Sequence, residues 1–267
     1  MELNKNGKIE VKFIGKEGDQ WPILDKLWDY FSLKGIKVVF ASIGTSSSPL
    51  TDLEIAETMG CPLHIFEVRK EKLDEWEEVK NILKVRKREE GASTFTEGVD
   101  TKWVLPKNVR IYPVLPSFST GTQEIEGTIY PTKEFVSAIK DCSESMSLKE
   151  ENGRVDIVKI CVGNNLELQI VYSLLSAGYR PGLLLIEWSS SPDEMLNTTI
   201  AAGHLQMCGY TLVTHYGNRC LYFHNDRCMY EICSWLSNKT DNPMVSELVS
   251  SITADKKTSS VTGVPQP

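Results

Sequence analysis

Several residues that could take part in chemistry stand at the ends of apolar runs. Gly44 follows the run in "VVFASIGTSSSP", and Glu67 ends "PLHIFE", 23 residues later. A glycine lets the backbone turn sharply and approach a ligand closely. An acid at about this spacing can accept hydrogen bonds from both hydroxyls of a ribose. The pattern predicts a nucleoside-binding half-domain, although Gly44 also fits a plain strand-to-helix turn and Glu67 a helix cap.

The residues after Gly44 predict a helix start of unusual charge. Ser48 stands at a favoured N-cap position and Pro49 at the first helical position. Asp52 and Glu54 follow in the first turns. These acids suit the helix dipole but repel a pyrophosphate, so the loop favours a phosphate-free cofactor over a dinucleotide.

The cysteines and histidines give no metal motif. The seven cysteines form no C-x-x-C pair, and their mostly apolar surroundings predict free thiols in a reducing compartment. Cys161 has no nearby histidine in sequence, so we interpret it as a buried filler rather than a nucleophile. His215 and His224 could face each other across a hairpin, but without a carboxylate in register we predict no metal site.

Composition restricts the partners. Hydrophobic residues make up 41% and charged residues 24% of the 267-residue chain, as in ordinary globular proteins. The net charge of −7 argues against nucleic-acid binding, which needs clustered Lys and Arg. No apolar run has the length of a membrane span, and the start "MELNKNGKIEVKF" lacks a signal peptide's apolar centre. We therefore expect an intracellular, cytoplasmic protein without a membrane partner.

The candidate residues are positioned by alternating strands and helices. Expected strands cover residues 7–15, 37–43, 62–68, 108–115, 155–162 and 182–188, and an apparent hairpin covers 210–224. Expected helices cover residues 21–33, 49–59, 69–88, 132–141, 166–178, 192–208 and 227–237, and 141–153 is an expected surface loop.

Continuous apolar strands separated by helices predict an α/β fold with a Rossmann-like, doubly wound sheet. We expect seven strands, all parallel except one antiparallel strand from the 210–224 hairpin. Ligands bind such sheets beyond the carboxyl ends of the strands. This edge should carry the following residues: Gly44, Glu67, Ser117, Cys161 and Glu187. The expected divisions are an N-terminal strand and helix (1–35), the Rossmann-like domain (36–237) and a low-complexity tail (238–267).

The order of these phrases resembles the FkbM-type family of S-adenosylmethionine-dependent O-methyltransferases. "VFASIGTSSSP" is similar to the family's first-strand loop, and "HIFEVRKEKLDEW" to its second strand with the ribose-binding acid. "VRIYPVLPSFSTG" and "YPTKEFVSAI" are similar to the third strand with its turn and to the following segment. "VDIVKICVGNNLELQIVYSLLSAGYRPGLLLIEW" resembles the fourth strand, helix and fifth strand. The resemblance covers about residues 36 to 225.

Two departures from the family concern its carboxylates. Where the family's fourth strand ends in Lys-Ile-Asp-x-Glu-Gly, this chain has "KICVGN", with Cys161 and Gly163 in place of the acids. The first loop has Ser42 and Thr45 around its one glycine, where the family has an acid and a further glycine. These losses should weaken binding of the cofactor.

The resemblance implies S-adenosylmethionine as cofactor and methyl transfer to a hydroxyl of a sugar or other small polar acceptor. The implied cofactor-binding residues are Gly44, Thr45, Glu67, Ser117, Cys161 and Asn164. Asn164 and Asn165 also fit ordinary turn residues. Glu187 and Trp188 are candidates for the acceptor side, and no general base can be identified.

Two other functions are compatible with the sequence. The missing carboxylates also fit a catalytically inactive methyltransferase-like domain that acts as a structural or interaction component of an assembly. The tail from 238 to 267 has a composition that cannot form a core of its own, so in such an assembly it would pack on a protein partner. A nicotinamide-dependent oxidoreductase is disfavoured by the hairpin and by the acidic helix start.

Overall fold

The computed structural model describes most of the chain between residues 11 and 224. The described ranges are 11–18, 20–24, 38–59, 61–89, 109–125, 127–145, 155–163, 166–189 and 192–224, with side chains described except at 82–89, 145 and 192–198. The expected helix at 227–237 and the tail at 238–267 lie outside these ranges.

Seven strands form the central sheet, and five helices are described around it. The strands are β3 (Phe40–Ile43), β4 (Leu63–Phe66), β5 (Val109–Tyr112), β9 (Ile157–Ile160), β10 (Leu183–Glu187), β11 (Tyr210–Tyr216) and β12 (Arg219–His224). The helices are α2 (Pro49–Thr58), α3 (Lys70–Glu89), α4 (Phe135–Ser145), α5 (Leu166–Ser176) and α6 (Pro192–Met207).

The strand order in the central sheet is β11-β12-β10-β9-β3-β4-β5. The first strand of this sheet along the chain is β3, which lies in its interior. The next two strands, β4 and β5, follow on one side of β3, and strands β9 to β12 lie on the other side. All neighbouring pairs are parallel except those of β12 with β10 and β11. The prediction of a mostly parallel, seven-stranded sheet with one reversed strand is therefore confirmed.

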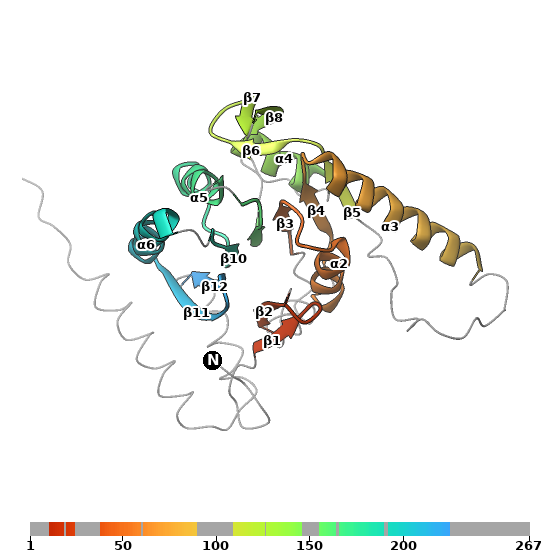
Figure 1. Ribbon diagram of the computed structural model, residues 1–267, viewed down its shortest axis with the longest axis horizontal. Helices are drawn as coiled ribbons and strands as arrows, with labels where there is room; N and C mark the ends of the chain where they lie inside the picture. Colours follow the sequence, from red (N-terminus) through yellow and green to blue (C-terminus); the bar gives the residue numbers. More distant parts are fainter. Residues whose placement is uncertain are drawn as a thin grey trace, which may run out of the picture.

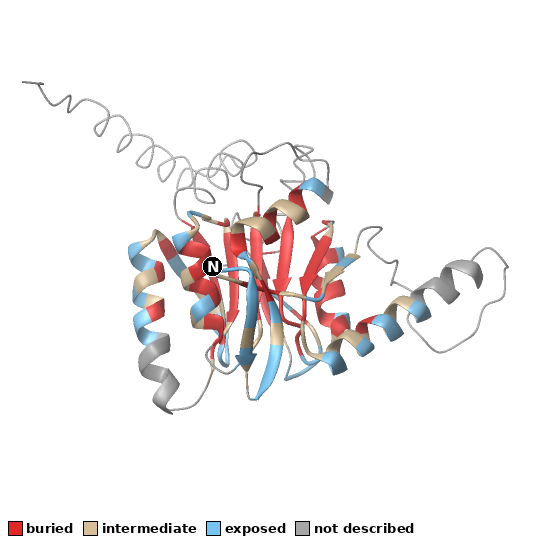
Figure 2. Ribbon diagram, turned by 90° about the horizontal axis from the view of Figure 1, so that it is seen from above, coloured by how far each residue is buried: buried red, intermediate tan, exposed pale blue. Residues whose placement is uncertain are grey.

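Helices cover both faces of the sheet, which is why its inner strands are buried along their whole length (Figure 1). One core joins a strand face to α2, α3 and the N-terminal hairpin, and contains Phe40, Leu63, Leu53 and Trp76. The other core joins the opposite face to α4, α5 and α6. Figure 2 shows the buried strands between two layers of helices that are exposed on their outer sides.

The N-terminal region differs from the prediction. Residues 21–24 were expected to begin a helix, but Trp21–Leu24 forms strand β2, which pairs antiparallel with β1 (Val11–Ile14). All four residues of β2 are buried. A strand buried on both faces reads as an apolar run, and a run of four residues does not distinguish helix from strand. Residues 25–33 of the expected helix lie outside the described ranges.

A second small sheet was not predicted. It contains β6 (Leu115–Ser117), β7 (Gly121–Ile125) and β8 (Thr128–Glu134) in the order β6-β8-β7. The third strand of the central sheet accordingly ends at Tyr112, and the helix expected from 132 begins at Phe135 because 132–134 belong to β8. The helix then continues to Ser145, through the start of the expected loop. Most residues of β7 and β8 are not buried, so the apolar pattern that reveals a strand is weak here.

No helix in the described part of the chain is long and apolar enough to span a membrane.

Candidate functional site

Four of the predicted residues meet at the carboxyl edge of the central sheet. Gly44 follows β3, Glu67 follows β4, Cys161 follows β9, and Glu187 is the last residue of β10. These strands are neighbours and run parallel, so their carboxyl ends lie at the same edge. Neighbouring strands β3 and β9 form the topological switch point, because the strands that follow β3 and those that follow β9 are added on opposite sides of the sheet. Sheets of this type bind ligands at such a point.

Gly44 is required by packing between strands. Its φ is +76°, and a Cβ atom placed on it would lie 2.1 Å from the carbonyl oxygen of Cys161. Its amide donates to the carbonyl of Phe66 at 2.8 Å. The close approach that the glycine permits is therefore to the chain at the end of β9, which is a structural reason for this residue.

The helix start after Gly44 is built as predicted. The Ser48 side chain accepts a hydrogen bond from the amide of Leu50, and Pro49 is the first helical residue. Asp52, in the first turn, is fully buried and forms an ion pair of 2.9 Å with the fully buried Lys159 of β9. Burial lowers the pKa of Lys159, but the attraction of the Asp52 carboxylate outweighs it and raises the pKa. The acid thus serves the core rather than a ligand.

The Glu67 carboxylate is 2% exposed and saturated with hydrogen bonds. It accepts five hydrogen bonds: from the backbone amides of Thr45, Val68 and Arg69, and from Nε and Nη2 of the Arg69 side chain. Burial raises the pKa of the Glu67 carboxyl, but the hydrogen bonds and charge of Arg69 outweigh burial, and the pKa lies below its usual value. Glu67 is therefore an ionised acceptor that is already occupied by Arg69.

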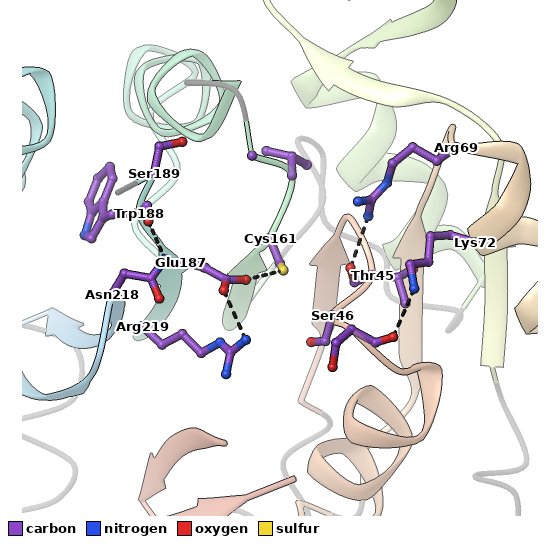
Figure 3. Close-up of a pocket in the computed structure, with 13 residues that line it drawn as sticks. Thr45, Ser46, Arg69, Lys72, Cys161, Glu187, Trp188, Ser189, Asn218 and Arg219 are labelled. Carbon is purple, nitrogen blue, oxygen red and sulfur yellow. Dashed lines mark hydrogen bonds and ion pairs between the residues drawn. The ribbon is translucent and has the colours of Figure 1, made fainter. Parts of the chain in front are cut away.

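A pocket of about 570 Å³ opens between the ends of β3, β9, β10 and β12. Figure 3 shows two walls that face each other across it. Its lining residues are Thr45, Ser46, Ser47, Arg69, Lys72, Cys161, Val162, Gly163, Glu187, Trp188, Ser189, Asn218 and Arg219. The lining is mostly polar and holds three cations, so the pocket suits a small polar ligand rather than an apolar one.

One wall carries a row of interacting side chains. The Cys161 thiol lies 2.7 Å from Oε2 of Glu187, and Nη2 of Arg219 lies 3.1 Å from Oε1 of Glu187 (Figure 3). Burial raises the pKa of the Cys161 thiol, and the nearby Glu187 carboxylate raises it further although Lys159 opposes this. A protonated thiol is a poor nucleophile. The arrangement therefore favours Glu187 as a hydrogen-bond acceptor for a ligand, with Cys161 as a donor to it.

The facing wall carries Arg69, Lys72 and the serines of the first loop. Lys72 Nζ donates to the carbonyl of Ser47 at 3.0 Å and pairs with Glu75 one helical turn away. Ser46 is 1% exposed, and its Oγ has no hydrogen-bond partner among the described residues. A buried hydroxyl without a partner is costly. Since Ser46 lines the pocket, a polar ligand atom there would supply what this hydroxyl lacks.

A smaller pocket of about 60 Å³ lies on the other side of Arg69. It is lined mainly by apolar residues: Gly44, Phe66, Glu67, Val68, Arg69, Leu115, Ile125, Tyr130, Val162 and Leu166. Arg69 and Val162 line both pockets. Arg69 therefore borders both a polar and a mainly apolar cavity.

The remaining predicted residues fall in different places. Thr45 and Trp188 line the larger pocket, and Thr45 Oγ1 also accepts a hydrogen bond from the buried Trp76 indole at 2.9 Å. Ser117 lies on β6 of the small sheet and lines neither pocket, whereas Leu115 of the same strand lines the smaller one. Asn164 lies outside the described residues.

Sequence reasoning did not single out Arg69, Lys72 and Arg219. Arg69 follows Glu67 by two residues. A basic residue so close to a candidate ribose-binding acid is a signal from which an ion pair between them could have been predicted. Arg219 stands at the start of the last strand, and only the antiparallel register between β10 and β12 brings it opposite Glu187. No local pattern could have identified that pair.

The histidines of the hairpin do not form a pair. His215 lies opposite Cys220 and His224 opposite Tyr210, so the register separates them. The suggestion that they could face each other is wrong. Among the described residues, no group of three histidine, cysteine or acidic side chains converges as a metal site would require.

Comparison with known proteins finds only low similarity, and only to solved structures. No protein-family model and no curated protein sequence matches this chain. Among solved structures, a point mutant of MtNAS and MtNAS in complex with MTA and tNA are similar, each with a TM-score of 0.31 and 11% sequence identity. These matches cover 74% of this chain, which spans only 58% and 59% of the length of the two structures.

Proposed function

We propose that this protein is a methyltransferase-type protein that binds an S-adenosyl ligand across the carboxyl edge of its central sheet. The observation that carries the proposal is the sheet itself. Its order places the first strand in the middle, two strands on one side and four on the other, and it reverses only β12. The resemblance of the sequence to S-adenosylmethionine-dependent O-methyltransferases agrees with this reversed strand, whereas dinucleotide-binding sheets usually end in parallel strands.

The residues at the sheet edge fit an adenosyl ligand in three respects. The ionised Glu67 stands where a ribose diol would need an acceptor. The smaller pocket is mainly apolar, as a base requires, and the larger pocket is polar. Ser46, whose buried hydroxyl has no partner among the described residues, lines the larger pocket, where the amino-acid end of the ligand would lie.

Methyl transfer would take place in the larger pocket. S-adenosylmethionine, when bound, supplies a methyl group on a positively charged sulfur. The chain would hold a sugar or other small polar acceptor through Glu187, which can accept a hydrogen bond from a hydroxyl, and through Asn218 and Ser189 in the same lining. Positioning would supply most of the rate enhancement, since attack needs an in-line approach of the acceptor oxygen.

A second function is favoured by one specific observation. Glu67 has no acceptor position left while Arg69 is bound to it, because a carboxylate has about four lone-pair sites and Glu67 already accepts five hydrogen bonds. If this pair never opens, the domain is a catalytically inactive component of a larger assembly. The tail at 238–267 would then be a candidate for contacts with a protein partner.

Calorimetric titration with S-adenosylmethionine and S-adenosylhomocysteine tests the proposal. We expect measurable binding by the parent protein and at least about tenfold weaker binding by Glu67→Gln, because a ligand would lose a charge-assisted hydrogen bond. Glu77→Gln removes the same charge from the ion pair with Lys80 on α3, whose two residues line neither pocket, and should leave the affinity unchanged. Binding that is indifferent to Glu67→Gln would move the site elsewhere, and no binding at millimolar ligand would favour the inactive domain.

A further inference from the structure

Two of the five hydrogen bonds to Glu67 can be exchanged without changing the fold. Three come from backbone amides in the loops after β3 and β4, whose positions are set by the sheet. The other two come from Nε and Nη2 of Arg69, at 3.0 and 2.8 Å. A ribose diol has two hydroxyl donors, so it matches in number the two hydrogen bonds that the Arg69 side chain makes. The diol can reach Glu67 only when Arg69 leaves.

Arg69 is placed so that it can leave. Its side chain is 31% exposed, in contrast to 1% for that of Glu67. Besides Glu67, the side chain donates only to the carbonyl of Thr45, from Nη2 at 3.1 Å, and Nη1 makes no hydrogen bond within the described part of the chain. Because the guanidinium is a planar fork, Nη1 and Nη2 together can bind a second carboxylate.

The larger pocket provides a place for that second carboxylate. Arg69 lines this pocket together with Lys72 and with the unpartnered hydroxyl of Ser46. Among the described residues, Lys72 is held only by a carbonyl and by Glu75, whose side chain is 40% exposed, and such an exposed ion pair contributes little. An anionic group near Ser46 would therefore meet two cations and a hydroxyl that lacks a partner.

We infer that Arg69 selects adenosyl ligands that carry an amino-acid carboxylate. This inference rests on the proposed function. The ligand carboxylate takes Arg69 into the larger pocket, and this movement releases Glu67 for the ribose diol. An adenosyl compound without a carboxylate must break the same pair between Arg69 and Glu67 with no replacement partner for the guanidinium. Arg69 thus acts as a specificity-determining residue that couples the two ends of one ligand.

Two ligands that differ only in the carboxylate test this coupling. S-adenosylhomocysteine and its decarboxylated analogue share the nucleoside, the thioether and the ammonium group. The parent protein should bind S-adenosylhomocysteine at least about tenfold more tightly, because its carboxylate gains a charge-assisted hydrogen bond. In Arg69→Ala the decarboxylated analogue should bind more tightly than in the parent, and the preference between the ligands should fall to about threefold or less.

Controls separate this effect from a change in folding or in overall charge. Lys80→Ala removes a cation from an exposed ion pair on the same helix and should keep the parent preference. Arg69→Met keeps much of the side-chain length without the charge and should behave as Arg69→Ala does, which guards against loss of one variant through misfolding. Thermal melts of each variant without ligand check that it is folded.

The outcomes distinguish the inference from the function on which it rests. Equal affinity of the parent protein for both ligands, or a preference that Arg69→Ala leaves unchanged, would overturn the role of Arg69 while leaving adenosyl binding intact. Absence of binding of either ligand to the parent and to both Arg69 variants would overturn the proposed function and the inference together.

Discussion

Replacing Asp52 by alanine removes one half of a buried ion pair beneath the candidate site. Asp52 and Lys159 are both fully buried, and their oxygen and nitrogen atoms lie 2.9 Å apart. The carboxylate also accepts hydrogen bonds from the Ser42 hydroxyl at 3.1 Å and the Ser46 amide at 3.4 Å. The same acid therefore balances a charge in the core and fixes the loop that contains Ser46.

The expected loss of stability is large for a single substitution. Removing one partner of a buried pair leaves an uncompensated charge and typically costs about 3 to 5 kcal/mol. Folded domains are stable by about 5 to 15 kcal/mol, so Asp52→Ala should lose a substantial part of the free energy of unfolding. The ring of Trp21 lies 4.7 Å from Nζ of Lys159, and this cation–π contact would offset only part of the loss.

The pH dependence of the stability of Asp52→Ala shows whether the unpaired Lys159 causes the loss. A buried lysine without a partner has a lowered pKa, so folding of Asp52→Ala would release a proton from Lys159. The unfolded state then binds more protons, and the stability of the variant should rise with pH toward the unfolded lysine pKa of about 10.4. The parent protein should lack this rise, because Asp52 raises the pKa of Lys159.

Urea denaturation followed by tryptophan fluorescence measures these changes, since Trp21 and Trp76 are fully buried. The double variant Asp52→Asn with Lys159→Met removes both charges and should lie within about 2 kcal/mol of the parent, as replacement of whole buried pairs usually does. If Asp52→Ala lost less than about 1 kcal/mol, or if the double variant lost as much as the single one, the reasoning from an uncompensated charge would be refuted.

Two further predictions concern Gly44 and His64. Gly44→Ala should destabilise the fold by at least about 2 kcal/mol more than Gly127→Ala in urea denaturation, because both glycines have nearly the same φ but only Gly44 is pressed against Cys161; equal losses would refute the packing argument. Burial lowers the pKa of His64 to about 4, and the charge of Arg110 adds to this. Because the folded pKa lies below the unfolded value of about 6.5, the unfolded state takes up the proton first. As the pH is lowered from 6.5 to 4, the free energy of unfolding should therefore fall by up to about 1.4 kcal/mol per pH unit. A His64→Gln variant that kept this slope would contradict its assignment to His64.

The central sheet could be predicted because its strands are buried on both faces. Phe40–Ile43, Leu63–Phe66 and Ile157–Ile160 are each entirely buried, so burial appears in the sequence as mainly apolar runs with one polar or charged residue in each. The apparent hairpin at 210–224 predicted the reversed strand, and Gly217, with a φ of +60°, lies in its turn. In β7 and β8 most side chains are not buried, and pairing between them is determined by backbone contacts that leave little trace in hydrophobicity.

The positions of the site's carboxylates at strand ends could be predicted, but the side chains that bind them could not. Apolar runs that end in Glu67 and Glu187 predicted which carboxylates stand at the edge of the sheet. What each carboxylate binds depends on side chains that arrive from elsewhere, such as Arg219 on β12, opposite Glu187. Asp52 was interpreted through the helix dipole and through repulsion of a pyrophosphate, whereas its partner Lys159 lies 107 residues later in the sequence. Tertiary pairing of this kind is set by the fold and has no local signature.

The free energy of opening Glu67 decides between the two proposed functions. On the Glu67 side two hydrogen bonds from Arg69 are replaced by two from a ribose diol, each typically worth about 1.5 to 3 kcal/mol to a charged group, but the buried carboxylate also loses the positive charge of Arg69. The guanidinium in turn loses its two hydrogen bonds to Glu67 and regains only those that water or a ligand offers. A ligand carboxylate in the larger pocket restores them, and a ligand without one does not. It follows that the opening of the pair between Glu67 and Arg69 is compensated only by adenosyl ligands that engage both pockets, and that for any other ligand the closed site is favoured.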